Sequence, residues 1–188
     1  MIANQVAGLF GSPYTAPVGD YESIQTVTVG SGGQASVEFT SIPSTYKHLQ
    51  IRSMLRTTEA STASNARIRV NSDSGLNYAY HYLVGDGGSA YAGGTSSQSS
   101  GLAGIIAGGN ATSGIFGGMV VDILDYANTN KNKTIRSLAG LDLNGSGGRI
   151  EFCSSLWMSS AAITSVKVDN FAGGNIAQYS SFALYGVK

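Results

Sequence analysis

Residues 115–141 constrain the fold more than any other stretch, because two apolar runs flank a polar turn: IFGGMVVDILDYANTNKNKTIRSLAGL. The polar segment 128–133 is rich in asparagine, which favours turns over strand interiors. In the first run, residues 116–124, the odd and the even positions both carry apolar side chains. This is typical of a strand covered on both sides, although a buried helix gives the same pattern. We predict a long central hairpin, with Asp122 and Asp125 near the end of its first strand.

Short alternating segments, separated by turns rich in glycine, serine and asparagine, continue through residues 21–188. About ten such segments, with no amphipathic helical pattern between them, predict an all-β, antiparallel β-sandwich of the jelly-roll type. We expect this sandwich to be a single domain, with long loops around one or two small strands in the glycine-rich part, residues 85–118. The expected core residues are Val37, Phe39, Leu49, Ile51, Ile68, Val70, Val120, Leu124, Phe152, Leu156, Val166, Phe182 and Leu184.

The chain is poor in charge. Charged residues make up 12% of the 188 residues, with eleven acidic and eleven basic side chains. A neutral chain has no general attraction for nucleic acid or for an anionic membrane. Low charge also limits the solubility of a free monomer, which favours a protein whose surface is partly covered by partners. Cys153 is the only cysteine, so no disulfide forms within the chain, and we expect it to be a small core residue.

We predict that the first twenty residues form an extended arm, because glycine and proline recur too often for a long helix or strand. They lack the pattern of a signal peptide, and no run in the chain is long enough for a membrane span. The arm nevertheless carries apolar side chains that a simple solvated tail would not need. We expect it to anchor the domain to a sister subunit or another protein through Ile2, Val6, Leu9, Phe10 and Tyr14.

Four arginines alternate with apolar residues on two predicted strands: Arg52, Arg56, Arg67 and Arg69. If these strands are neighbours, the four side chains line one exposed surface. Such a surface either keeps the outer face of a sheet soluble or docks a protein partner, since arginine is enriched at interfaces. Nucleic-acid binding is the least supported of the three interpretations, because the chain is neutral overall.

Tyr78, Tyr80 and Tyr82 share one face of a predicted strand. A tyrosine stripe is either a packed, half-buried surface or a platform on which sugars stack. The segment just before it, residues 71–77, resembles a calcium loop only superficially. It lacks the carboxylate spacing and closing glutamate of an EF-hand, and a turn explains Asn71 and Asp73 more simply.

Catalytic chemistry has little support in the sequence. Its two histidines, His48 and His81, each occur singly within a strand pattern, and zinc sites need several converging ligands. Neither a nucleophile elbow nor a phosphate-binding loop is present, despite the many glycines. Asp122, Asp125 and Asp142 are the acids most suited to converge, but their positions suit turn caps better. We therefore expect no enzyme, cofactor or metal.

Several segments together resemble a family of small virion proteins from phages of aquatic bacteria. The resemblance covers roughly residues 21–188, and the phrase FALYG at 182–186 is similar to the last strand of β-sandwich modules in phage tail fibres and capsid decorations. No catalytic motif accompanies it. The segments are IPSTYKHLQIR (42–52), DILDYANTNK (122–131), SLWM (155–158) and YSSFALYGV (179–187).

The resemblance implies a structural protein of the virion, made in the host cytoplasm, with no membrane or nucleic-acid partner. One candidate is a capsid decoration or cement protein, which binds the coat surface, stabilises it and is often a homotrimer. The alternative is a tail- or head-fibre module that recognises host surface glycans. We expect the decoration protein, with a coat protein or another virion protein as its partner, because only a twenty-residue arm precedes the single domain.

Overall fold

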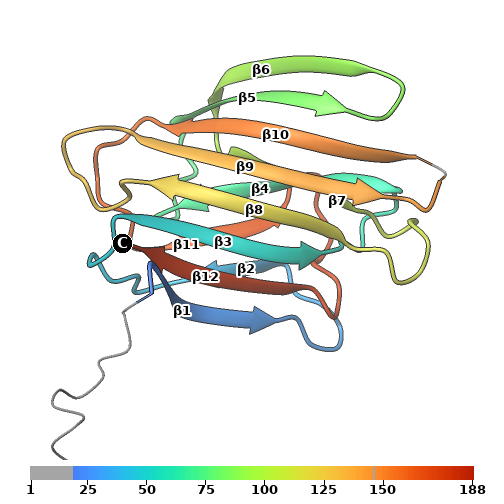
Figure 1. The fold of residues 1–188 in the computed structure, drawn as a ribbon, viewed down its shortest axis with the longest axis horizontal. Helices are drawn as coiled ribbons and strands as arrows, with labels where there is room; N and C mark the ends of the chain where they lie inside the picture. Colours follow the sequence, from blue (N-terminus) through green and yellow to red (C-terminus); the bar gives the residue numbers. More distant parts are fainter. Residues whose placement is uncertain (1–18, 146) are drawn as a thin grey trace, which may run out of the picture.

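Two antiparallel sheets stack to form a β-sandwich in the computed structural model, which describes residues 19–145 and 147–188 (Figure 1). The all-β, sandwich prediction is confirmed, and the described residues contain no helix. Consequently, no helix in this part of the chain is long and apolar enough to cross a membrane. Residues 1–18, which include most of the predicted arm, lie outside the described residues.

The two sheets differ in width. The larger has eight strands, in the spatial order β1 (Tyr21–Thr28), β12 (Ser181–Val187), β3 (His48–Leu55), β8 (Gly117–Leu124), β9 (Lys133–Asp142), β10 (Gly148–Trp157), β5 (Tyr78–Gly85) and β6 (Ala90–Gln98). The smaller has four, in the order β2 (Ser36–Phe39), β11 (Val166–Asn170), β4 (Ala63–Val70) and β7 (Gly101–Ala107). The smaller sheet therefore covers only part of the larger one.

The predicted central hairpin is present as β8 and β9, the fourth and fifth strands of the larger sheet. Asp122 lies in β8 opposite Arg136 of β9, and Asp125 directly follows β8. Strands β8 and β9 are joined through residues 125–132, which include most of the polar segment 128–133 that predicted the turn.

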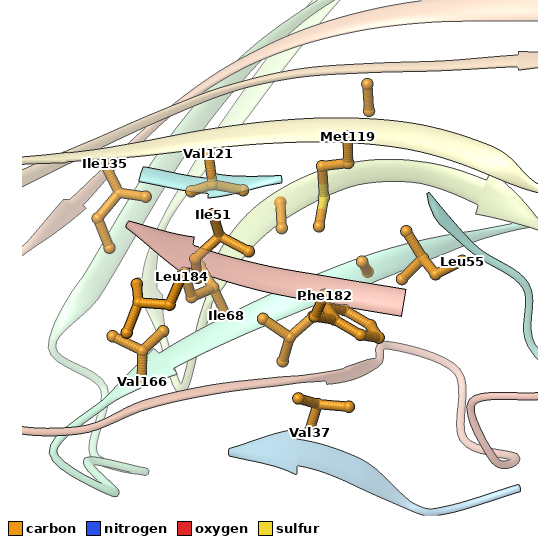
Figure 2. Packing of buried hydrophobic residues seen from close by; sticks show 14 of the residues in the cluster. Val37, Ile51, Leu55, Ile68, Met119, Val121, Ile135, Val166, Phe182 and Leu184 are labelled. Carbon is orange, nitrogen blue, oxygen red and sulfur yellow. The ribbon is translucent and has the colours of Figure 1, made fainter. Parts of the chain in front are cut away.

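The core lies between the two sheets, where alternate side chains from both converge (Figure 2). Ile51, Met119, Val121 and Leu184 enter it from the larger sheet, and Ile68 from the smaller. Of the predicted core residues, nine are buried: Val37, Phe39, Leu49, Ile51, Ile68, Val70, Val166, Phe182 and Leu184.

The other four predicted core residues, Val120, Leu124, Phe152 and Leu156, lie on the opposite face of the larger sheet, and that part of the prediction is wrong. Strand β8 is apolar on both faces, so its pattern does not fix which face turns inward. Strand β10 turns its more polar face inward: Glu151, Cys153, Ser155 and Trp157.

Strand β7 explains why small and polar residues of β10 face the core. The hydroxyl of Ser155 donates to the carbonyl of Leu102 at 3.1 Å and accepts from the amide of the same residue at 3.1 Å. A Cβ on Gly104 would lie 2.5 Å from Cβ of Ala139 in β9, so the two sheets approach closely here. Strand β7 is buried along its whole length, although it lies in the stretch predicted to be mostly loop.

Candidate functional site

The outer face of the larger sheet carries a row of exposed apolar side chains. The strand register places Val120 opposite Leu138, Leu138 opposite Phe152, and Phe152 opposite Leu83. The row therefore crosses four adjacent strands, β8, β9, β10 and β5. Directly opposed side chains on one face of a sheet are close enough to touch, so this is a continuous apolar stripe.

A second row, two residues further along the strands, adds a hollow to this surface. Met54 lies opposite Gly118, Gly118 opposite Gly140, and Gly140 opposite Ile150. Because the two glycines lack side chains, a shallow hollow of about 580 Å³ opens over β8 and β9. We call the six exposed side chains of the two rows the apolar band: Met54, Leu83, Val120, Leu138, Ile150 and Phe152, with exposed fractions from 38% to 64%.

Polar residues border the apolar band. Gln50 Nε2 donates to Asp122 Oδ1 at 2.8 Å, and Arg52 Nε donates to Gln50 Oε1 at 2.7 Å. The Arg52 guanidinium also lies 5.3 Å from the ring centroids of both Tyr21 and Tyr185. An apolar centre with a polar, hydrogen-bonded margin is the usual composition of a protein–protein interface.

The four arginines do not line one surface, because the strands that carry them belong to different sheets. Arg52 lies on β3 of the larger sheet. Arg67 and Arg69 lie on β4 of the smaller sheet, and both form ion pairs with Asp169.

Arg56 has a local structural role. Its guanidinium donates hydrogen bonds of 2.6–3.2 Å to four backbone carbonyls within residues 109–115. These bonds hold the loop between β7 and β8 against the end of β3. Of the four arginines, Arg52 alone lies beside the apolar band, opposite Val120 in the register.

The three tyrosines of β5 point toward the interior side of the larger sheet. Tyr78 is fully buried, the backbone amide of Val70 donates to its hydroxyl at 3.1 Å, and burial raises its pKa to about 12. A glycan cannot reach Tyr78. Tyr80 and Tyr82 are half-buried and line a cleft together with Tyr91 of β6, which sequence analysis did not single out.

The three acids examined for chemistry do not converge, although Asp125 lies beside His48, with its Oδ1 3.7 Å from Nδ1 of the imidazole. Asp122 is on the outer face of β8, while Asp142 lies at the far end of β9 and caps a turn by accepting from the Asn144 amide at 2.7 Å. Hydrogen bonding to the ammonium of Lys131 lowers the pKa of Asp125, which also forms an ion pair with Lys47. Its backbone amide donates to Nδ1 of His48 at 3.0 Å.

Residues 71–77 form a turn organised by Asp73. Its carboxylate accepts from the Gly75 amide at 2.8 Å and from the Trp157 indole at 2.6 Å, and the indole bond lowers its pKa. Asn71 is a hydrogen-bond partner of Thr164 and Ala162 rather than of Asp73. Within the described ranges, no three His, Cys, Asp or Glu side chains group together as metal ligands do.

Comparisons with known proteins add nothing to this geometry. No family model matches the chain, and neither do any of the curated proteins or the solved structures compared with it. The predicted arm contacts Ile2, Val6, Leu9, Phe10 and Tyr14 lie outside the described residues. The apolar band is therefore the most prominent surface feature on which to base a function.

Proposed function

We propose that this protein is a structural protein of a phage virion, a capsid decoration or cement protein that binds the coat surface and stabilises it. The observation that carries the proposal is the apolar band, which crosses strands β3, β8, β9, β10 and β5 of the larger sheet. Contiguous exposed apolar patches on soluble proteins mark interaction sites far more often than isolated exposed apolar residues do. The resemblance of residues 21–188 to small virion proteins supplies the identity of the partner.

Two features favour a protein partner for the band over a small ligand. The hollow is shallow and open on the outer face of the larger sheet, whereas small-molecule sites are deep enough to enclose most of the ligand. The band also contains Met54 and Phe152 and is flanked by Arg52, residue types that are enriched at protein interfaces.

The direct test of the proposal is quantitative mass spectrometry of purified virions from the source of the sequence. A decoration protein is expected at a copy number comparable to that of the coat protein. Absence of the chain from the particles would overturn the proposal. A copy number of only a few per particle would instead support the fibre alternative.

A matched pair of charge substitutions tests the band as the attachment surface. Phe152 and Ser154 both lie exposed on the outer face of β10, two residues apart. We expect Phe152→Lys to weaken binding to undecorated particles at least tenfold, because a lysine must lose its hydration in an apolar interface. Ser154→Lys, outside the band, should bind as the wild type does.

Co-sedimentation with particles that lack the protein measures this binding, and thermal melting confirms that both variants are folded. Equal binding of Phe152→Lys and the wild type would exclude the band as the contact with the coat. Sedimentation of the free protein separately reports whether the band instead joins copies of this chain, such as the homotrimer expected from the resemblance.

The second candidate function is a fibre module that recognises host surface glycans. It is favoured by one observation, the cleft beside Tyr80 and Tyr82. Loss of host adsorption on Tyr82→Ala, with the number of copies per virion unchanged, would support this candidate over the first.

A further inference from the structure

A cleft opens where the larger sheet extends beyond the smaller one. Strands β5 and β6 form the far edge of the larger sheet, next to β10, and lie at the top of the view in Figure 1. The smaller sheet ends at β7, so the inner surface of β5 and β6 is covered only in part. The cleft has a volume of about 210 Å³ and is lined by residues of both sheets. That is below the roughly 300–1,000 Å³ of sites for drug-sized ligands, which restricts the occupant to a single small ring.

Aromatic rings line much of this cleft. Tyr80 and Tyr82 come from β5, Tyr91 from β6, and Phe171 from the loop after β11. Gly93 lies opposite Tyr82 in the register, and a Cβ on Gly93 would lie 2.5 Å from the Tyr82 hydroxyl oxygen. The Tyr82 ring therefore lies across the backbone of β6 at a position that only glycine leaves open.

The same cleft contains polar atoms that are not satisfied by the protein. Glu151 lines the cleft, is only 3% exposed, and its Oε2 accepts no hydrogen bond from the described residues. Asn65, on the opposite sheet, likewise has an Oδ1 that is shielded from solvent and has no donor in the described part of the chain. Buried acceptors without donors are unfavourable, so a ligand that supplies donors gains affinity from both.

The charges in the cleft restrict the ligand class further. Arg149 lines the cleft together with Glu151, so one cationic and one anionic group face the same small volume. A cationic ligand would be repelled by the Arg149 guanidinium, and an anionic ligand would be repelled by the Glu151 carboxylate. A neutral ligand with several hydroxyl groups avoids both conflicts, since hydroxyls donate to Glu151 and Asn65 and accept from Arg149.

We propose that this cleft binds one ring of a neutral saccharide, with a sugar face against the tyrosine rings and sugar hydroxyls bonded to Glu151 and Asn65. The inference deepens the second candidate function and rests on it for its biological meaning. It is independent of the apolar band, which lies on the opposite face of the larger sheet. Failure of sugar binding would therefore leave the decoration proposal intact.

Binding of methyl glycosides of glucose, galactose, mannose and N-acetylglucosamine to the full chain tests the proposal, by saturation-transfer NMR and calorimetry. A ligand of about 13 non-hydrogen atoms at ordinary ligand efficiency has a dissociation constant in the millimolar range. We expect at least one of the four probes to bind with that affinity. Tetramethylammonium and inorganic phosphate serve as the cationic and anionic comparison probes.

Four variants connect binding to the cleft. Tyr82→Ala removes a ring, Gly93→Ala displaces the same ring without removing it, and Glu151→Gln keeps the shape but weakens the acceptor. Each should weaken sugar binding about tenfold or more while the protein remains folded by circular dichroism. Tyr21→Ala, at the far edge of the same sheet, is the matched control and should bind as the wild type does.

Three outcomes would overturn the proposal. They are the absence of binding by all four glycosides, binding that Tyr82→Ala and Glu151→Gln leave unchanged, and preferential binding of tetramethylammonium or phosphate. The last result would assign the cleft to a charged ligand. If Tyr82→Ala fails to fold, Gly93→Ala and Glu151→Gln decide between these outcomes.

Discussion

Glu151 destabilises the fold because its carboxyl is buried, and the same carboxyl lines the proposed binding cleft. It lies on the inner face of β10, where a strand in a sandwich normally presents an apolar side chain. Burial raises the pKa of its carboxyl above the ordinary value of 4.5, while a hydrogen bond with Cys153 opposes that shift. A carboxyl in this position is better tolerated when protonated than when ionised.

The stability of the protein should consequently depend on pH through Glu151. The raised pKa means that the folded state holds the proton more tightly than the unfolded state does. Stability from this group is present below pH 4.5 and is lost as the pH rises through the higher folded pKa. We expect Glu151→Gln to be more stable than the wild type at pH 7, with the difference vanishing near pH 4.

Urea unfolding of both proteins across this pH range measures the effect. A parallel series on Glu38→Gln, an exposed residue on β2, controls for the general effect of removing one negative charge. A difference between the wild type and Glu151→Gln that stays constant with pH would show that the carboxyl does not titrate differently on folding.

At the scale of elements, β7 of the smaller sheet packs closely against β9 of the larger one. Gly104 has φ +122°, a conformation that side chains rarely adopt, and its missing Cβ leaves room for Ala139. The partner strand β4 shifts its register between Ala66 and Arg67, next to this glycine. Gly104 thus combines an irregular backbone with a close contact between the two sheets.

Substitution of Gly104 by alanine should destabilise the fold by roughly 2–5 kcal/mol, the sum of backbone strain and overpacking. Gly118 on β8 is the matched control, because a Cβ there meets nothing within 4 Å and its φ is not positive. Gly118→Ala should change stability by less than about 0.5 kcal/mol. Thermal unfolding of the two variants measures both effects, and similar melting temperatures would contradict this account.

The same elements show how far sequence reasoning reaches. The inward faces of β3 and β4 follow from alternation, because each of these strands has one clearly more apolar face. Strand β8 does not have one, since Val120 is as apolar as its inward neighbours, and in β10 the more apolar face, with Phe152, points outward. Two residues of the apolar band, Val120 and Phe152, were therefore predicted as core.

The cleft could be predicted only in part. The tyrosine stripe of β5 was recognised, but Tyr91 lies on β6, in the glycine-rich stretch predicted to be mostly loop. Phe171 reaches the cleft through the pairing of β11 with the distant strand β4, which no local pattern encodes. Glu151 carried one signal, a carboxylate within an alternating strand, but it was not singled out, because placing Phe152 in the core puts its neighbour Glu151 on the opposite face.

At the scale of the whole molecule, residues 19–145 and 147–188 form a two-sheet sandwich with a core of their own. Within these ranges the buried core side chains run from Val29 to Leu184, and the outer strands of the larger sheet are polar or glycine-rich. Both β1 and β6 also contain register shifts, which discourage pairing with another sheet edge.

Deletion of residues 1–18 should therefore leave the melting temperature nearly unchanged. If the arm anchors the protein as proposed, the same deletion should reduce binding to particles that lack the protein. The intact chain with Ser154→Lys is the control for handling and folding. A clear fall in melting temperature on deletion would mean that the arm stabilises the sandwich itself. If the shortened protein binds the particles as tightly as the full chain does, the apolar band remains as the only proposed anchor.

Strand β12 has a consequence for how the molecule is made. It lies between β1 and β3, and Tyr21 pairs with Val187 across 166 positions of sequence (187 − 21). On the ribosome, β1 and β3 emerge long before the strand that joins them. The nascent chain therefore exposes two unpaired strand edges, and contacts this distant in sequence form slowly. Until β12 has left the ribosome, the space between β1 and β3 can accept the β12 strand of another copy. Synthesis of several copies close together therefore favours domain-swapped dimers.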